Sequence, residues 1–230
     1  MKNDFRIQFL GHNAWLLTVG AFRVLIDPFL TGNPVAATVA EKVDADYILV
    51  SHGHGDHFGD TLKIAKRTGA VVVAIAEIAG YVTSHGYENT VAMNIGGTVA
   101  LPFGRLKMVQ AIHSSTLPDG TPGGNSAGFL LTLADGKTLY FACDTALYGD
   151  MILLKKPSPV DYAFLPIGDL FTMGPDDALE AVKLIQSRFV VPCHYNTWKV
   201  IAQDPLAWKT RVEAETDTEV IILQSGEIIE

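Results

Sequence analysis

A stretch of seven residues, Ser51-His52-Gly53-His54-Gly55-Asp56-His57, constrains this chain more than any other part of its sequence. It holds three of the chain's seven histidines together with an aspartate. Neutral imidazole is the commonest metal ligand in proteins, and carboxylates join it around divalent ions. The residues just before it, Tyr47-Ile48-Leu49-Val50, have the apolar character of a short buried strand. The sequence therefore predicts a metal site on the loop that follows this strand.

The two glycines of the stretch predict a tight loop rather than a helix, because glycine adopts backbone angles that other residues avoid. The alternative is a polar turn, or a histidine tract that picks up metal incidentally. The spacing of the histidines directly after a strand favours the metal site.

Three more residues of metal-binding type stand at the ends of predicted strands: His113 after Leu106–Ile112, Asp144 after Thr138–Phe141, and His194 after Phe189–Val191. Asp144 has a second interpretation, because an aspartate there could cap a helix that begins near Ala146. The repeated placement of such residues at strand ends predicts that they converge on one site.

These residues and their order resemble the metallo-β-lactamase superfamily, whose signature is His-x-His-x-Asp-His after a strand. The later matching segments are Ala111-Ile112-His113-Ser114, Phe141-Ala142-Cys143-Asp144-Thr145 and Pro192-Cys193-His194-Tyr195. A wider match includes Gly11-His12, the stretch from Leu25 to Pro34, and Ser51 to Asp60. The chain looks like the small metal-dependent hydrolases near the ascorbate-phosphate lactonase-like branch. The resemblance covers nearly the whole chain and is specific for fold and metal site, but not for substrate.

The resemblance implies an α/β fold, a four-layer αββα sandwich of two mixed β-sheets flanked by helices, with residues 1–230 as a single domain. The sequence pattern agrees, since early strand–helix alternation changes to consecutive strands that suggest a second sheet. The first three strands are predicted as an antiparallel meander over Phe5–Leu10, Ala14–Val19 and Ala21–Ile26. Asp135-Gly136 predicts a hairpin between two later strands. Helices are predicted over Val35–Lys42, Asp60–Arg67, Ala76–Ser84, Pro175–Ser187 and Pro205–Val212.

By the same resemblance, His52, His54 and His113 bind a first metal, Asp56, His57 and His194 bind a second, and Asp144 bridges the two. The expected cofactors are two divalent ions, zinc first, with manganese, iron or nickel as alternatives because nitrogen and oxygen ligands do not select among them. A metal-bound hydroxide would then hydrolyse a small-molecule ester, lactone or amide. The expected catalytic residues are Asp144, Asp56 and His12.

Two further residues have open roles. His12 is either an ordinary turn residue or, as its loop's place in the family suggests, a substrate contact. Asp27 either caps the following loop or orients a ligand histidine through the ring's other N–H, which the family pattern favours. The Gly/Pro-rich segment Leu117–Asn125 is either a connector or a wall of the pocket. Cys143 and Cys193 are expected to be small buried apolar residues.

The bulk composition limits the functional classes. A net charge of −8 argues against binding nucleic acid or an anionic membrane surface. Two cysteines, no signal-peptide core and no apolar run of the ~18 residues that span a bilayer predict a cytoplasmic protein. The expected partner is a small-molecule substrate, with a homo-oligomer left open. The alternatives are a phosphodiesterase and a non-enzymatic metal-dependent binding protein on the same fold.

Overall fold

The computed structural model describes residues 5–156 and 158–230, which divide into two compact units. The first unit consists of residues 5–97, Ser114–Ser126 and Gln224–Glu230, and the second of Thr98–His113 and Ala127–Leu223. Each unit contains one seven-stranded sheet. The predicted single domain over residues 1–230 stays a prediction.

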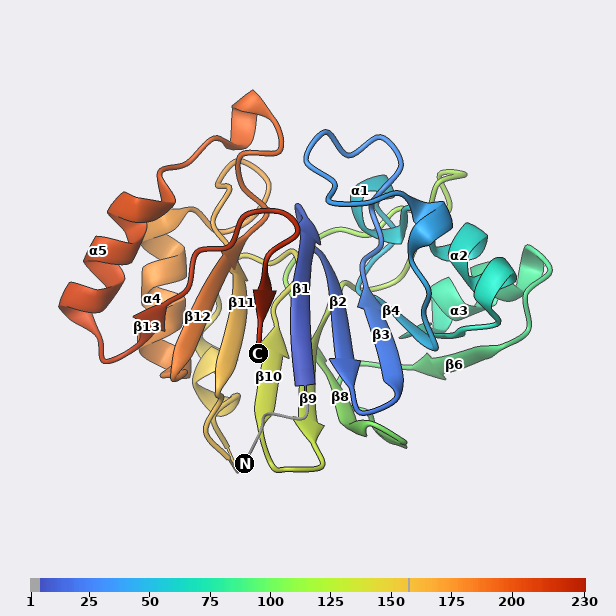
Figure 1. Ribbon diagram of the computed structural model, residues 1–230, viewed down its shortest axis with the longest axis horizontal. Helices are drawn as coiled ribbons and strands as arrows, with labels where there is room; N and C mark the ends of the chain where they lie inside the picture. Colours follow the sequence, from blue (N-terminus) through green and yellow to red (C-terminus); the bar gives the residue numbers. More distant parts are fainter. Residues whose placement is uncertain (1–4, 157) are drawn as a thin grey trace. The chain divides into compact units, whose positions relative to one another are not determined.

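The sheet of the first unit has the strand order β14-β1-β2-β3-β4-β5-β6 (Figure 1). Its strands are β1 (Phe5–Gly11), β2 (Ala14–Val19), β3 (Phe22–Ile26), β4 (Tyr47–Val50), β5 (Val71–Ile75), β6 (Thr90–Met93) and β14 (Ile228–Ile229). The first three form the predicted antiparallel meander, and β3 to β6 pair in parallel. β6 and β14 were not predicted, because β6 has no fully buried residue and β14 has only two residues.

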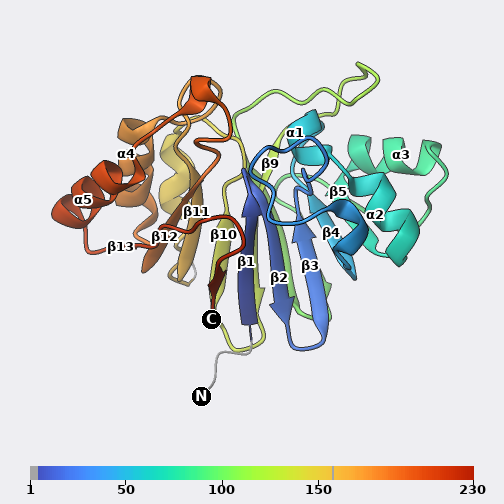
Figure 2. The same ribbon diagram turned by 45° about the horizontal axis from the view of Figure 1, so that its top comes forward.

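Helices α2 (Thr61–Thr68) and α3 (Ala76–Ser84) confirm two predicted helices of this unit and pack on its parallel strands (Figure 2). Gly69 ends α2 in the left-handed conformation, with φ 76°. The helix predicted over Val35–Lys42 is wrong except for one 3-10 turn, η1 (Ala40–Lys42). The Asn33 side chain accepts the Val35 N–H and donates to the Phe29 carbonyl, and such local bonds compete with a helix.

The sheet of the second unit has the order β13-β12-β11-β10-β9-β8-β7. Its strands are β7 (Thr98–Leu101), β8 (Gly104–Gln110), β9 (Ala127–Leu133), β10 (Thr138–Phe141), β11 (Tyr162–Pro166), β12 (Phe189–Cys193) and β13 (Glu219–Val220). The predicted hairpin joins β9 to β10, and the four strands from β10 to β13 run parallel. Since parallel strands end at one edge of a sheet, residues that follow β10 and β12 are brought to the same edge.

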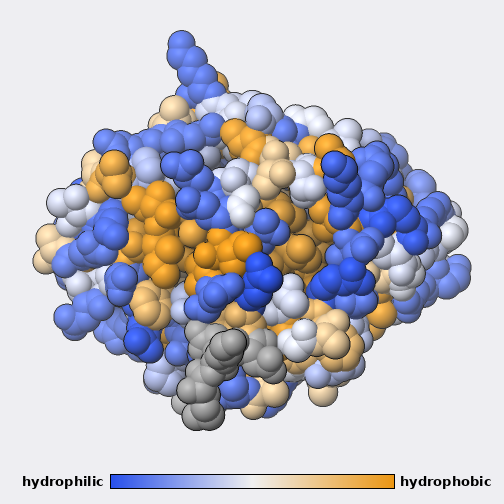
Figure 3. Space-filling view, viewed as in Figure 1, coloured by the Kyte–Doolittle hydropathy of each residue, from blue (hydrophilic) through white to orange (hydrophobic). Residues whose placement is uncertain are grey.

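Helices α4 (Pro175–Ile185) and α5 (Pro205–Glu215) both begin with proline at a first-turn position, where its missing N–H costs nothing. The Asp204 carboxylate caps α5 by accepting two backbone N–H groups. Buried residues of both helices, Trp208 of α5 among them, join residues of β11 and β12 in one apolar cluster. On the face shown in Figure 3, hydrophobic residues also gather over β12.

Two smaller 3-10 turns complete the second unit, η2 (Gly149–Leu153) and η3 (Lys199–Ile201). No helix begins at Ala146, so the alternative in which Asp144 merely caps a helix is wrong. Within residues 5–156 and 158–230, no helix combines the length and the apolar character that crossing a bilayer requires.

Candidate metal centre

Asp27 and Ser51 fix the start of the histidine-rich stretch in the first unit. The Ser51 N–H and hydroxyl donate to the two carboxylate oxygens of Asp27, at 2.8 and 2.6 Å. Both residues are fully buried. The Ser51 Oγ also lies 2.9 Å from His52 Nδ1. Because its single proton goes to Asp27, the Ser51 oxygen accepts from His52 Nδ1–H, which leaves His52 Nε2 with its lone pair for a metal.

That nitrogen faces the next histidine. His52 Nε2 lies 3.1 Å from His54 Nδ1, and the Ser114 hydroxyl lies 3.4 Å from the other ring nitrogen of His54. Two imidazole nitrogens on one tetrahedral zinc, each about 2.0–2.1 Å from the ion, are roughly 3.3 Å apart. The spacing and the nitrogen donors of this pair therefore fit a shared divalent ion.

Asp56 and His57 lie in a one-turn helix, α1 (Gly55–Phe58), so the prediction of a loop throughout the stretch is wrong here. His54 precedes the turn in an extended conformation, and its carbonyl accepts the N–H groups of His57 and Phe58. Neither glycine of the stretch has a positive φ. The positive φ occurs instead at Gly59, where a Cβ would collide with the Pro28 carbonyl oxygen.

Glycine is needed at position 53 because of close packing and not because of an unusual backbone angle. Its N–H donates to the Ser115 hydroxyl at 3.1 Å, and a Cβ on it would lie 3.0 Å from the carbonyl carbon and oxygen of Thr116. The surrounding Gly/Pro-rich segment folds back on itself through a bridge between Thr116 and Pro122. The start of this segment and the two residues before it therefore pack directly against the backbone between two candidate ligands, and the role of Leu117–Asn125 as connector or pocket wall stays a prediction.

Asp27 also orients His57. Its Oδ2 lies 2.9 Å from His57 Nδ1, and the carboxylate accepts the ring N–H, which directs Nε2 away as the ligand atom. Asp27 has φ 44°, a conformation that aspartate tolerates better than most residues. The interpretation of Asp27 as the residue that orients a ligand histidine agrees with this geometry.

His12 belongs to the same group of side chains in the first unit. It occupies the β1–β2 turn with φ 61°, yet its ring is buried and its Nε2 lies 3.3 Å from Asp56 Oδ2. His12, Asp56 and His57 each offer a ligand-type atom within 4.8 Å of the others. His12 is thus a turn residue by its backbone and a member of the polar cluster by its side chain.

The second unit holds the other three predicted ligands. Asp144 is buried after β10, and its Oδ2 lies 3.1 Å from His194 Nε2 and 3.5 Å from His113 Nε2. His113 follows the end of β8 by three residues, because that strand ends at Gln110 and not at the predicted Ile112. A carboxylate between two imidazoles is a donor set that suits a divalent ion.

The backbone beside these ligands is strained. Cys143 has φ 53°, a left-handed conformation that is uncommon for residues other than glycine, asparagine, aspartate and histidine, and the candidate ligand His194 has the same φ. Such strain concentrates at functional sites, where the surrounding structure holds it in place. Cys143 and Cys193 are buried and outside any disulfide, as expected of small apolar residues.

The sequence did not reveal the roles of Ser51, Ser114 and Ser115. Ser51 links Asp27 to His52, and the other two contact the ligand loop from a segment about sixty residues away in the chain. Only the position of Ser51, between a strand and the first ligand, was a usable signal.

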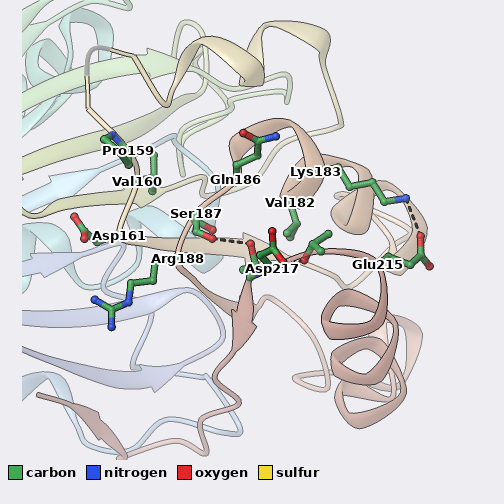
Figure 4. Close-up of a pocket in the computed structure, with 12 residues that line it drawn as sticks. Pro159, Val160, Asp161, Val182, Lys183, Gln186, Ser187, Arg188, Glu215 and Asp217 are labelled. Atoms are coloured by element: carbon green, nitrogen blue, oxygen red, sulfur yellow. Dashed lines mark hydrogen bonds and ion pairs between the residues drawn. The ribbon is translucent and has the colours of Figure 1, made fainter.

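A pocket of about 630 Å³ elsewhere in the second unit contains none of the predicted site residues (Figure 4). It lies where β11 and β12 begin, between Asp161 and Arg188, whereas His194 follows the opposite end of β12. Lys183 at its rim is paired with Glu215 at 2.8 Å. This pocket therefore lies apart from His194 and the other predicted site residues.

Comparison with known proteins identifies the family of this chain. A family model described as a β-lactamase superfamily domain matches residues 22–195. The chain belongs to the metallo-β-lactamase superfamily. This superfamily member is 48% identical over 229 residues to a UPF0173 metal-dependent hydrolase of Pelotomaculum thermopropionicum, with 98% of this chain and 99% of the relative covered. It is 50% identical over 223 residues to a UPF0173 metal-dependent hydrolase of Thermus thermophilus, with 97% of each covered.

A solved structure extends the likeness to three dimensions. Igni18, described as a novel metallo hydrolase from the hyperthermophilic archaeon Ignicoccus hospitalis, matches with a TM-score of 0.89 and 34% identity, over 98% of this chain and 97% of that one. The predicted family and the fold class, two mixed sheets flanked by helices, are confirmed. This superfamily member is a metal-dependent hydrolase.

Proposed function

We propose that this metal-dependent hydrolase acts on a small-molecule ester, lactone or amide and uses two divalent ions, zinc first. The observation that carries the proposal is the hydrogen bonding of Asp27 and Ser51, which leaves the Nε2 atoms of His57 and His52 as metal donors. Ligand histidines are oriented in this way by a hydrogen bond to the ring nitrogen that does not bind the metal.

The proposed ligand set is that of the family resemblance. His52, His54 and His113 hold the first ion, Asp56, His57 and His194 hold the second, and Asp144 is shared. The groupings within each unit support this division, since His52 faces His54 and Asp144 lies beside both His113 and His194. When bound, the two ions supply an activated water and stabilise charge that develops on the substrate oxygen.

The chain's own residues contribute position and proton transfer. Asp27 keeps the His57 ring in one orientation, and Asp144 supplies negative charge between two imidazoles. His12, next to Asp56, is placed to donate a hydrogen bond to the substrate or to pass a proton to the leaving group. The proposed roles make Asp144, Asp56 and His12 the catalytic residues.

A phosphodiesterase is the second candidate among enzymes, because the same metal pair can neutralise a phosphate. The net charge of −8 disfavours a long nucleic-acid substrate. A metal-dependent binding protein without catalysis is disfavoured by the full ligand set. Manganese, iron and nickel remain alternatives to zinc, and a small-molecule substrate and a cytoplasmic location are part of the proposal.

The test is a turnover screen of the protein reconstituted separately with zinc, manganese, iron and nickel. The substrates are matched p-nitrophenyl esters, aryl lactones, anilides and bis-p-nitrophenyl phosphate. We expect carboxyl compounds to be hydrolysed with a higher kcat/KM than the phosphodiester. The reverse order would establish the phosphodiesterase, and the absence of turnover with every metal and substrate would favour a binding protein.

A further inference from the structure

Two large apolar side chains project from a tight turn that follows β11. Leu170 is 64% exposed and Phe171 is 54% exposed. The Thr172 N–H donates to the Asp169 carbonyl at 2.6 Å and the Asp169 N–H to the Met173 carbonyl at 3.1 Å, so the two residues occupy the corner of the turn. Turn corners normally carry glycine, proline or polar residues, and contiguous exposed apolar groups mark binding surfaces.

This turn is anchored to the residues that carry the candidate ligands of the second unit. Gly168 lies so close to the His194 carbonyl oxygen that a Cβ would collide with it. On the other side, the Met173 N–H donates to the carbonyl of Thr145, the neighbour of Asp144. Leu170 is two residues from Gly168, a chain distance of at most about 7 Å. The apolar corner is therefore held within a short reach of two ligand-bearing segments.

A third exposed apolar residue comes from the segment after β12. Val200 in η3 is 63% exposed. Its segment is tied to the turn after β11 by the Gln203 side chain, which donates to the Gly168 carbonyl at 3.3 Å. The Asn196 N–H closes the same segment by donating to the Ile201 carbonyl. Two loops from neighbouring strand ends thus present apolar groups beside one half of the proposed metal centre.

We propose that Leu170, Phe171 and Val200 bind an apolar group of the substrate and determine specificity. The substrate class is then an ester, lactone or amide that carries an aromatic ring or an alkyl chain of several carbons next to the scissile carbonyl. This inference rests on the proposed function. The occupant is assigned to the substrate, because the turn that carries the apolar corner contacts the backbone of His194 and of Thr145, the neighbour of Asp144.

The experiment compares the zinc-loaded wild type with Leu170→Ser/Phe171→Ser on p-nitrophenyl acetate, butyrate, hexanoate and phenylacetate. In the wild type, kcat/KM should rise with acyl length. In the variant we expect a loss of roughly 10-fold or more for hexanoate and phenylacetate, with acetate within about two-fold. Leu153→Ser is the matched control, since Leu153 is equally exposed at 54% on η2, and it should leave the whole series unchanged.

Two measurements keep the outcomes distinct. If the wild type hydrolyses none of these esters and none of the lactones and anilides of the turnover screen, the proposed function fails, and calorimetric binding of butyrate, hexanoate and phenylacetate then tests the apolar contact alone. Tighter binding of the longer acids that disappears in the double variant supports the inference, and equal binding overturns it. The inference is also overturned if kcat/KM of the variant depends on acyl length as it does in the wild type. It is overturned as well if the wild type is an oligomer that dissociates on substitution without any change in specificity.

Discussion

Asp27 and His57 are joined by a buried hydrogen bond of 2.9 Å between Oδ2 and Nδ1, thirty residues apart in the chain. Asp27→Asn should preserve the backbone, because asparagine also tolerates the φ of 44°. Its neutral amide is a weaker acceptor for the ring N–H, so we expect metal affinity to fall about 10- to 100-fold. Chelator competition followed by elemental analysis measures this. Asp60→Asn is the control, because the buried Asp60 carboxylate accepts hydrogen bonds from Leu30 and Thr31, and its loss should lower stability without lowering metal affinity.

Gly53 and Gly55 flank His54, yet only the first is crowded. A Cβ at Gly53 would lie 3.0 Å from Thr116 backbone atoms, whereas a Cβ at Gly55 would meet none of the described residues within 4 Å. Gly53→Ala should therefore shift the ligand loop and lower both metal content and turnover at least several-fold. Gly55→Ala should retain both within about two-fold. Equal metal retention by the two variants would show that the packing of Gly53 does not position the ligands.

Asp144→Asn tests the shared carboxylate. We expect about two divalent ions per wild-type chain when metal is not limiting, and a loss of much of the second ion together with most activity in the variant. The near-isosteric amide should keep the fold, which circular dichroism and the Tm of the metal-free protein check. If turnover stays within a few-fold of wild type, Asp144 does not bridge two metals.

A variant of His12 distinguishes a role in substrate chemistry from a role in metal binding, because the proposed set of seven ligands is complete without His12. His12→Asn suits the positive φ of 61° better than alanine and removes the imidazole. We expect both metals and the Tm to be retained while kcat/KM falls by roughly 10²-fold, the lower range for a lost acid–base group. Loss of metal would instead make His12 a ligand or the support of one.

Arg23 and Asp46 give the first unit a pH-dependent contribution to stability. The side-chain hydrogen bond from Arg23 lowers the pKa of the Asp46 carboxyl below its usual 3.8. A carboxyl with a lowered pKa in the folded state stabilises the fold above that usual value, and this contribution is lost as the pH falls through the folded-state pKa. Asp46→Asn should cost at most about 1 kcal/mol at neutral pH, because the pair is partly exposed. The free energies of unfolding of wild type and variant, from urea titrations at pH 7 and pH 3, should converge at the lower pH. A constant difference would contradict the assignment.

The strands and the candidate ligand residues at their ends followed from local patterns, whereas the division of these residues into two metal sites came from the family resemblance. β2 and α3 have the predicted bounds, because runs such as Ala14–Val19 and the turn signals around them lie within a few residues. The turn α1 could not be predicted in this way. Its conformation depends on Gly59 fitting against Pro28, thirty-one residues earlier, and the two glycines of the stretch pointed to a loop. The sequence predicted only part of the hydrogen-bonded group of Asp27, Ser51 and His57. It suggests that an aspartate orients a ligand histidine, but it does not indicate which histidine. The length of β14 is set by its pairing with β1, more than two hundred residues away.

The first unit is assembled from three separate stretches of chain, residues 5–97, Ser114–Ser126 and Gln224–Glu230. No single break in the gene can therefore release either unit intact. A fragment that stopped at Gly97 would leave β1 as an unprotected sheet edge, because β14 is supplied from the other end of the chain. It would also lack Thr116, whose backbone packs on Gly53. Gene fusion or fission at a single point therefore cannot add or remove one unit of this fold, and its two sheets have to be inherited together.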